Sequence, residues 1–256
     1  MMRSVAVSRI QRRLGFRQDL SSAIIDELIA AQEKYERGVP VPIVASAYMG
    51  RFLVGGGSFL PWFLRTEVTT ITTSIGEERV PLPPDFLREY EEDALYYFNP
   101  AADPTIGQNQ WRPLWKDDIQ ANRIKYGALW PQFTGSASPS DSSNAAEWFE
   151  WGPKAYSLDG NYFRIFPLPQ QVYTLKMIYY ARDAALSPTV DSENKWLHNA
   201  SEVLMGEAGY QMAHTARDDN RIQYFQTIRD EGVARLFVYT EGMQHENRTY
   251  AMGRED

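Results

Sequence analysis

The sequence predicts an α+β fold, in which a helical bundle from the N- and C-terminal helices is combined with a small antiparallel β-sheet or sandwich from the middle of the chain. Apolar residues recur at helical spacing near both ends, whereas β-branched and aromatic residues alternate between them. The 256 residues are enough to bury a core, and no run approaches the roughly 20 apolar residues that span a bilayer. We therefore expect one domain over residues 1–256 and no membrane contact.

The helical part is expected over residues 1–40 and 192–240. Its clearest helix carries an apolar stripe with steps of four, three and four residues, formed by Ile24, Leu28, Ala31 and Tyr35. Asp19 or Ser21 is expected to cap the free N–H groups at the start of this helix, and Gly38 lies where it should end.

The C-terminal helices follow the same logic. Asn194 is expected to cap a helix on which an apolar residue recurs every four positions, at Trp196, Ala200, Leu204, Ala208 and Met212. Gly206 and Gly209 are costly inside a helix, so we expect them to permit the close approach of a neighbouring helix. Asp218 or Asp219 should begin the last helix. Its buried side is expected to comprise Ile222, Phe225, Ile228 and Leu236. Residues 241–256 are polar and are predicted to form a C-terminal tail.

The first 18 residues are basic, and no acid precedes Asp19. The five arginines are Arg3, Arg9, Arg12, Arg13 and Arg17. This composition is similar to that of a mitochondrial transit peptide. Because Ile10 and Leu14 lie four residues apart, a helix with a basic face is the favoured interpretation, with solvent or an acidic protein partner against that face.

The β part is expected over residues 64–90 and 151–183. Residues 66–86 read as a hairpin that turns at 75–78, with Asp85 then capping a short helix over 85–98. Residues 154–166 read as a second hairpin, which turns at Asp159 and Gly160. Pro167 and Pro169 interrupt the pairing before a strand over 172–182. One face of this strand is wholly apolar or aromatic and should pack on the core, through Tyr173, Leu175, Met177 and Tyr179.

Residues 99–150 form an inserted region rich in tryptophan and serine. One helix is expected within it, beginning at Asp117 or Asp118 and ending at Gly127. The small, polar stretch 135–146 is expected to be an exposed loop.

The sequence offers little for chemistry, and we predict no catalytic, cofactor-binding or metal-binding residue and no enzyme activity. There is no cysteine, so disulfides and thiolate metal sites are excluded. His198, His214 and His245 lack ligand spacing, and neither a Walker motif nor a nucleophile elbow is present. A net charge of -7 disfavours a conventional nucleic-acid binder.

A carbohydrate-active or sugar-binding protein is the enzyme-class alternative. Acid pairs occur at Glu91–Glu92 and Asp117–Asp118, and several tryptophans could stack on sugar rings. These tryptophans are Trp111, Trp115, Trp130, Trp148 and Trp151. Packing in a core or an interface is the favoured role for such rings.

The order of these pieces resembles the head-to-tail adaptor family of tailed bacteriophages, whose members are also called connector or tail tubular proteins. Four stretches carry the resemblance over roughly residues 10–240: IIDELIAAQEKYE, VTTITTSIGEERVPLPPDFL, PKAYSLDGNYFRIFPLPQQVYTLKMIYYAR and NKWLHNASEVLMGEAGYQMAH. Within the second stretch, Leu82, Pro83, Asp85 and Phe86 are similar to the family's leucine-proline-aspartate-phenylalanine corner. The tryptophan- and serine-rich region departs from the family pattern.

The resemblance implies a structural virion protein of the phage neck, made in the host cytoplasm. It implies a homo-oligomeric ring, usually of twelve subunits, beneath the portal protein and above a downstream tail or nozzle protein. Double-stranded DNA would pass through this ring during ejection without specific binding, and no cofactor is implied. The C-terminal segment is expected to contact the portal through Phe237, Tyr239, Met243, Tyr250 and Met252.

Two alternatives stay open at this point. One is the carbohydrate-active or sugar-binding function, in this setting that of a phage tail protein. The other is a different phage ring protein, a stopper or a tail terminator, which differs from an adaptor in its partner.

Overall fold

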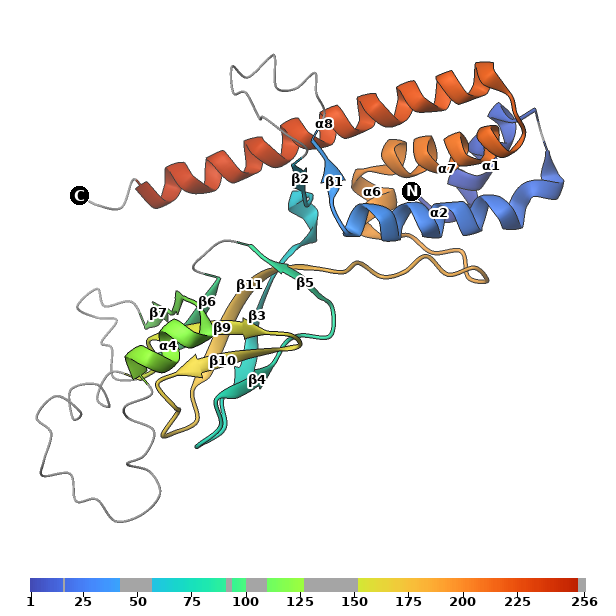
Figure 1. The fold of residues 1–256 in the computed structure, drawn as a ribbon. Helices are drawn as coiled ribbons and strands as arrows, with labels where there is room; N and C mark the ends of the chain where they lie inside the picture. The colour runs from blue at the N-terminus through green and yellow to red at the C-terminus, as the bar shows by residue number, and fades with distance from the viewer. Residues whose placement is uncertain (16, 42–56, 91–93, 100–109, 127–151, 253–256) are drawn as a thin grey trace, which may run out of the picture. The chain divides into compact units, whose positions relative to one another are not determined.

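The computed structural model divides the chain into two compact units, a helical unit of residues 1–64 with 182–256 and a β unit of residues 65–181. Helices come from both ends of the chain and antiparallel sheets from its middle, which confirms the predicted α+β class (Figure 1). The expectation of a single domain stays a prediction. The structure describes residues 1–15, 17–41, 57–90, 94–99, 110–126 and 152–252, with the side chains of 244–252 outside the description.

The helical unit is built mainly from helices that pack side by side. They are α1 (Arg3–Arg13), α2 (Ser21–Glu36), α6 (Lys195–Asn199), α7 (Ser201–Thr215) and α8 (Asp219–Met252). The described part of this unit also contains two single turns of 3-10 helix, Gln18–Leu20 and Trp62–Leu64, and the short antiparallel pair β1 (Val39–Pro40) with β2 (Ser58–Phe59). No helix among the described residues has the length and apolar content needed to cross a bilayer.

Helix α2 has the predicted apolar stripe. Ile24, Leu28, Ala31 and Tyr35 are all at most 2% exposed. The predicted side-chain cap is wrong, because the residue at the N-cap is Leu20, and Ser21 Oγ instead donates to the Gln18 carbonyl at 2.7 Å. Ile10 of α1 and Leu14, the residue directly after this helix, are both buried, so the basic segment is a helix with one side in the core.

Helices α6 and α7 replace the single helix that the fourfold spacing predicted. Asn194 is the predicted cap, and its Oδ1 accepts from the Leu197 N–H at 2.9 Å. The helical conformation is interrupted at Ala200, which has φ -136°, and α7 begins at the next residue. All five residues of the predicted stripe are nevertheless buried, so the break does not change which side faces the core.

Helices α7 and α8 approach each other closely at two glycines, as predicted. A Cβ on Gly206 would lie 2.6 Å from the backbone nitrogen of Arg229, and one on Gly209 would lie 2.3 Å from the Phe225 ring. Asp218 Oδ1 accepts from the Arg221 N–H at the start of α8. Helix α8 then continues to Met252, through most of residues 241–256, for which the sequence predicts a C-terminal tail.

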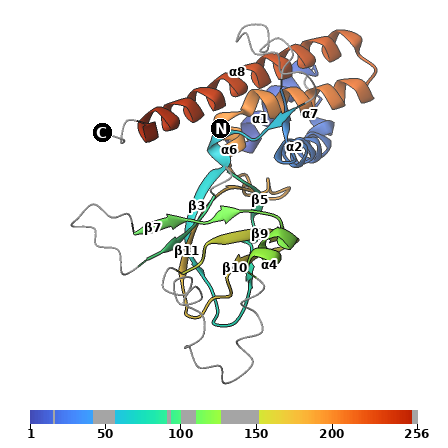
Figure 2. The same cartoon turned by 60° about the vertical axis from the view of Figure 1, so that its left-hand side comes forward.

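The β unit contains two sheets (Figure 2). One has the order β3-β11-β6-β7, with β5 also paired to β11; its strands are β3 (Arg65–Thr72), β5 (Phe86–Glu89), β6 (Leu95–Phe98), β7 (Trp111–Pro113) and β11 (Thr174–Ala181). The other has the order β4-β10-β9-β8, from β4 (Arg79–Pro81), β8 (Trp115–Lys116), β9 (Ala155–Asp159) and β10 (Tyr162–Phe166). All pairs are antiparallel except β8 with β9. One apolar cluster joins side chains from both sheets, so the core lies between them.

Two sequence predictions for residues 66–98 are wrong. Strands β3 and β4 do not pair with each other, because β3 pairs with β11 and β4 with β10 in the other sheet. Residues 86–98 form β5 and β6 instead of a helix, and burial along β6 alternates with the period of a strand. Asp85 caps no helix; its Oδ1 accepts from the Tyr179 hydroxyl at 2.9 Å.

The second predicted hairpin and the third strand are confirmed. Strands β9 and β10 pair across a turn at Gly160 and Asn161, where Gly160 has φ +61°. The turn lies one residue later than the predicted Asp159 and Gly160, because Asp159 pairs with Tyr162. The predicted face of β11 is buried. The prolines after Phe166 carry the chain from one sheet to the other, because β10 and β11 belong to different sheets. Helix α4 (Ile119–Tyr126) is the predicted helix of the inserted region, and Asp118 Oδ1 accepts from the Gln120 N–H at its start.

The glycine contacts give the first testable prediction. Gly206→Ala should lower the free energy of unfolding by about 1–3 kcal/mol, because the new methyl group meets the backbone of α8. Gly242→Ala is the matched control in a helix, since nothing lies within 4 Å of the position that its new Cβ would occupy. It should be neutral or raise stability by up to about 1 kcal/mol. Urea unfolding measures both, and equal effects at the two sites would contradict the close helix contact.

Candidate partner-contact surface

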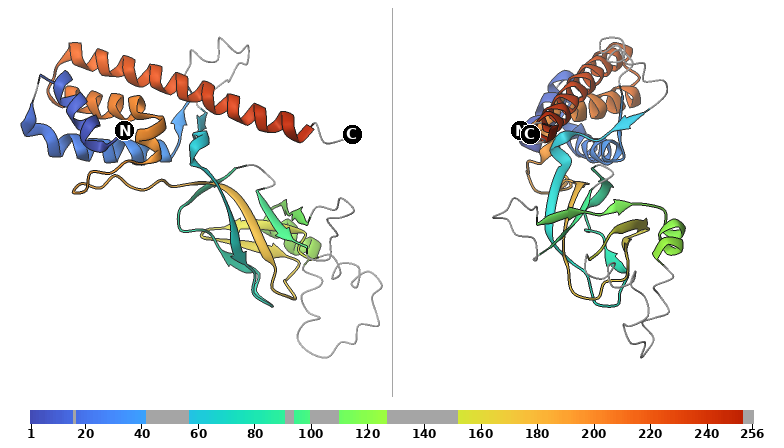
Figure 3. Two further views of the ribbon diagram at one scale, coloured as in Figure 1. Left: turned by 180° about the vertical axis from the view of Figure 1, so that it is seen from behind. Right: turned by 90° about the vertical axis from the view of Figure 1, so that its left-hand side faces the viewer.

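The C-terminal half of α8 carries the largest group of exposed apolar side chains on one described helix of the helical unit. Val238, Tyr239 and Met243 are 54%, 67% and 40% exposed. Tyr239 and Met243 are four residues apart, so they lie on the same side of the helix. The ribbon shows this end of α8 running on beyond α7 (Figures 1 and 3). A helix of 34 residues is about 51 Å long at 1.5 Å per residue.

The residues that the sequence predicts to contact the portal differ in how exposed their side chains are. Phe237 is 4% exposed and packs edge-on against Phe59, with ring centroids 5.3 Å apart. Tyr239 and Met243 are exposed, whereas the side chains of Tyr250 and Met252 lie outside the described part of α8. Val238 was not among the residues predicted from the sequence, although it lies directly between Phe237 and Tyr239.

A groove of about 460 Å³ lies beside Tyr239 in the helical unit. Its apolar lining includes Trp62, Leu236 and Tyr239, and its polar lining includes Glu202 and Arg235. Glu202 Oε2 accepts from Arg235 Nη1 at 2.8 Å, so these two charges already satisfy each other. An aromatic and aliphatic lining beside a neutralised polar pair suits the docking of a protein segment.

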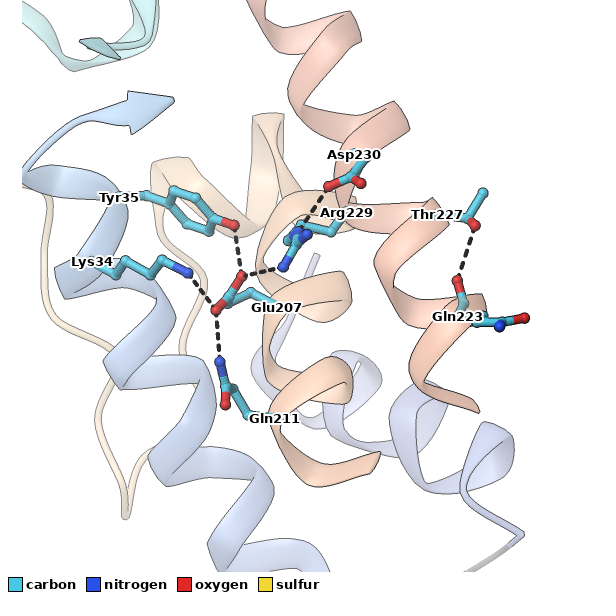
Figure 4. A network of polar contacts seen from close by, with 8 residues as sticks. All are labelled: Lys34, Tyr35, Glu207, Gln211, Gln223, Thr227, Arg229 and Asp230. Atoms are coloured by element: carbon cyan, nitrogen blue, oxygen red, sulfur yellow. Dashed lines mark hydrogen bonds and ion pairs between the residues drawn. The ribbon is translucent and has the colours of Figure 1, made fainter. Parts of the chain in front are cut away.

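A buried carboxylate fixes α8 to the rest of the bundle. Glu207 on α7 is 2% exposed, and its two oxygens accept hydrogen bonds from three helices (Figure 4). Lys34 Nζ lies 2.6 Å from Oε1, and the Tyr35 hydroxyl lies 3.0 Å from Oε2. Gln211 donates to Oε1 at 3.0 Å, and Arg229 on α8 donates to Oε2 at 3.4 Å. One side chain therefore connects α2, α7 and α8.

The hydrogen bonds to Glu207 favour the ionised form of its carboxyl group. Burial by itself would raise the pKa of Glu207, but the hydrogen bonds from Lys34 and Gln211 and the charge of Lys34 lower that pKa below its ordinary value. Burial and the Glu207 charge together raise the pKa of the Tyr35 hydroxyl, which therefore stays protonated and keeps donating. Glu207 is an anion that neighbouring donors satisfy, and a structural role accounts for all of its contacts.

Within the described part of the chain, the residues that could carry chemistry are not brought together. No group of three or more histidine, cysteine, aspartate or glutamate side chains is placed to hold a metal ion within the described ranges. His198 is largely exposed, 3.3 Å from Glu193, and His214 is exposed on α7, whereas His245 lies outside the described side chains. Trp115 is 67% exposed, and Trp111 packs against Phe98. Trp130, Trp148, Trp151, Glu91 and Glu92 fall outside the described residues.

Comparison with known proteins identifies the class of this chain as a phage adaptor, a structural protein of the virion. A family model described as SU10 adaptor protein matches residues 6–254. Because the match covers nearly the whole sequence, the chain belongs to the SU10 adaptor protein family. This family implies association with portal and tail proteins. A search of the curated proteins found no match.

The Glu207 contacts give a pH-dependent prediction. Glu207→Gln should lower the free energy of unfolding at pH 7 by about 2 kcal/mol, because a neutral amide binds the two cations more weakly. The folded-state pKa lies below the ordinary 4.5, so the contribution is present above pH 4.5 and is lost as the pH falls through the folded-state pKa. The difference between wild type and variant should therefore shrink below about pH 4.

Glu77→Gln is the control for this measurement, because Glu77 is an exposed acid of the β unit. Its effect should stay within about 0.5 kcal/mol at every pH. Urea unfolding curves from pH 3 to pH 7 give both series. A Glu207→Gln effect that is constant with pH would show that the carboxylate charge is not what connects the helices.

Proposed function

We propose that this chain is the head-to-tail adaptor subunit of a phage neck, which forms a homo-oligomeric ring beneath the portal and joins the portal to the tail. The observation that carries the proposal is the family match over residues 6–254. The narrower likeness to tail tubular proteins, a ring of twelve subunits and synthesis in the host cytoplasm belong to the same proposal. The subunit acts by fitting between its partners and without catalysis.

The portal contact is proposed to lie on the C-terminal part of α8. Val238, Tyr239 and Met243 offer exposed apolar area there, and aromatic residues and methionine are enriched at protein interfaces. Phe237 would support this surface from inside through its contact with Phe59. Tyr250 and Met252 would extend the contact along the last turns of α8.

The net charge of -7 suits a ring through which DNA passes. A channel lined by negative charge repels the phosphate backbone, so DNA would slide without being held. Ejection through the neck is therefore part of the proposal. A ring structure whose channel lining is positively charged would contradict this part of it.

Reconstitution with the portal tests the proposed function. The purified chain is mixed with its portal ring and observed by electron microscopy and native mass measurement. A ring of this chain bound to the portal is the expected result. A chain that binds the tail side of another neck protein but never the portal would indicate a stopper or tail terminator, and a chain that stays monomeric with the portal would contradict the ring.

The exposed residues of α8 give a mutational prediction. Tyr239→Ala with Met243→Ala should weaken portal binding by at least about tenfold, because interface aromatics carry much of the binding energy. Tyr162→Ala, a 43% exposed tyrosine of the β unit, is the control and should bind as wild type does. Binding is measured by surface plasmon resonance on immobilised portal. Equal affinities for all three proteins would remove this part of α8 from the contact.

A further inference from the structure

A second groove of the helical unit combines an apolar floor with a basic rim. It has a volume of about 430 Å³ and lies between α1 and α8, beside the first turns of α7. The floor is formed by Met205 and Ile228, which are half-buried, and beneath them by Ile10 and Phe225, which are at most 2% exposed. The rim on the α1 side carries Arg9, Arg12 and Arg13. The basic segment near the N-terminus therefore borders a groove with apolar area.

The charges of this rim are not neutralised within the described part of the chain. Arg9 and Arg12 are exposed, and neither forms an ion pair with a described carboxylate. Arg13 lies over the Tyr224 ring with Cζ 5.1 Å from the centroid, which leaves its charge uncompensated. Glu202 is the acid that lines the groove, and it already forms an ion pair with Arg235, with Nη1 2.8 Å from Oε2. Exposed arginines alone would be ordinary, but here they flank apolar area.

A complementary surface lies on another helix of the same unit. On the outer flank of α2, Ile25 and Ile29 are half-buried and four residues apart. Asp26 and Glu33 are exposed on the same flank and seven residues apart, about 10 Å along the helix. Neither acid forms an ion pair with a described cation. Two cations lie nearby: Arg37 is one turn after Glu33, and Arg182 already pairs with Glu36 at 3.5 Å. Two apolar side chains bordered by acids match an apolar floor bordered by arginines.

We infer that the groove between α1 and α8 receives the outer flank of α2 from a second copy of this chain. Ile25 and Ile29 of the second copy would cover the apolar floor, and Asp26 and Glu33 would pair with Arg9 and Arg12. The groove and the α2 flank are different surfaces, so each copy keeps one of them free for a further copy. Such a heterologous contact forms a ring when its rotation closes, and the inference therefore rests on the proposed ring.

Charge reversal with rescue tests this contact. One chain carries Arg9→Glu and Arg12→Glu, and a second carries Asp26→Arg and Glu33→Arg. Each chain alone should associate at least about 100-fold more weakly than wild type, because like charges would face each other. A 1:1 mixture should recover assembly, since the acidic groove then receives a basic flank and the unchanged groove receives an acidic flank. Recovery also shows that both variants are folded.

A chain with all four substitutions is the second rescue and should assemble with itself. Lys125→Glu with Lys195→Glu is the matched control, because these exposed lysines lie outside the groove and give the same change of charge as the first variant. This control should assemble as wild type does. Sedimentation velocity of the full chain, alone and with the portal ring, measures every sample.

The outcomes separate this inference from the proposed function. If wild type assembles and both reversed chains assemble equally well, the contact is wrong while the ring stands. If reversal abolishes binding of the portal or of DNA but leaves assembly unchanged, the groove belongs to that other ligand and the inference is overturned. If wild type forms no oligomer alone or with the portal, the proposed ring fails, and this contact fails with it.

Discussion

The close contact between α7 and α8 is the constraint on which the helical unit depends. Side chains at residues 206 and 209 would collide with α8, so glycine at both positions sets the distance between the helices. At that distance the carboxylate of Glu207, between the two glycines in sequence, reaches Arg229 on α8 while also binding α2. Leaving a buried anion unpaired would cost several kcal/mol, so the helices and their polar contacts require one another.

This contact determines which part of α8 is buried in the bundle and which part is exposed. Its first half is held in the bundle, where Phe225 and Leu236 are buried, whereas Val238, Tyr239 and Met243 are exposed further along. A helix that is fixed at one end offers its other end to a partner without first having to be ordered, which reduces the entropic cost of binding. The β unit is stabilised separately, by one apolar core between its two sheets that holds the strands in register.

The sequence predicted the features that depend on local periodicity, or on a residue type that suits one structural role, such as a helix cap or a close contact between helices. The stripe of α2, the Asn194 cap, the two glycines of α7 and the buried face of β11 are examples. The predictions from the sequence were wrong where pairing with a residue far away in the chain determines the structure. Strands β3 and β4 look like a hairpin locally, but β3 pairs with a strand about a hundred residues away and β4 with one about eighty residues away. Glu207 was missed because its four donors come from three helices, and no local pattern contains them.

Hydrogen–deuterium exchange along α8 tests whether one part of this helix is held in the bundle while the next part contacts the portal. We predict slow exchange for the backbone amides of residues 222–236 in the isolated chain, and a gain of protection at residues 238–243 when the portal ring is added. Fast exchange at 222–236, or no change at 238–243 in a sample that has bound the portal, would contradict the account.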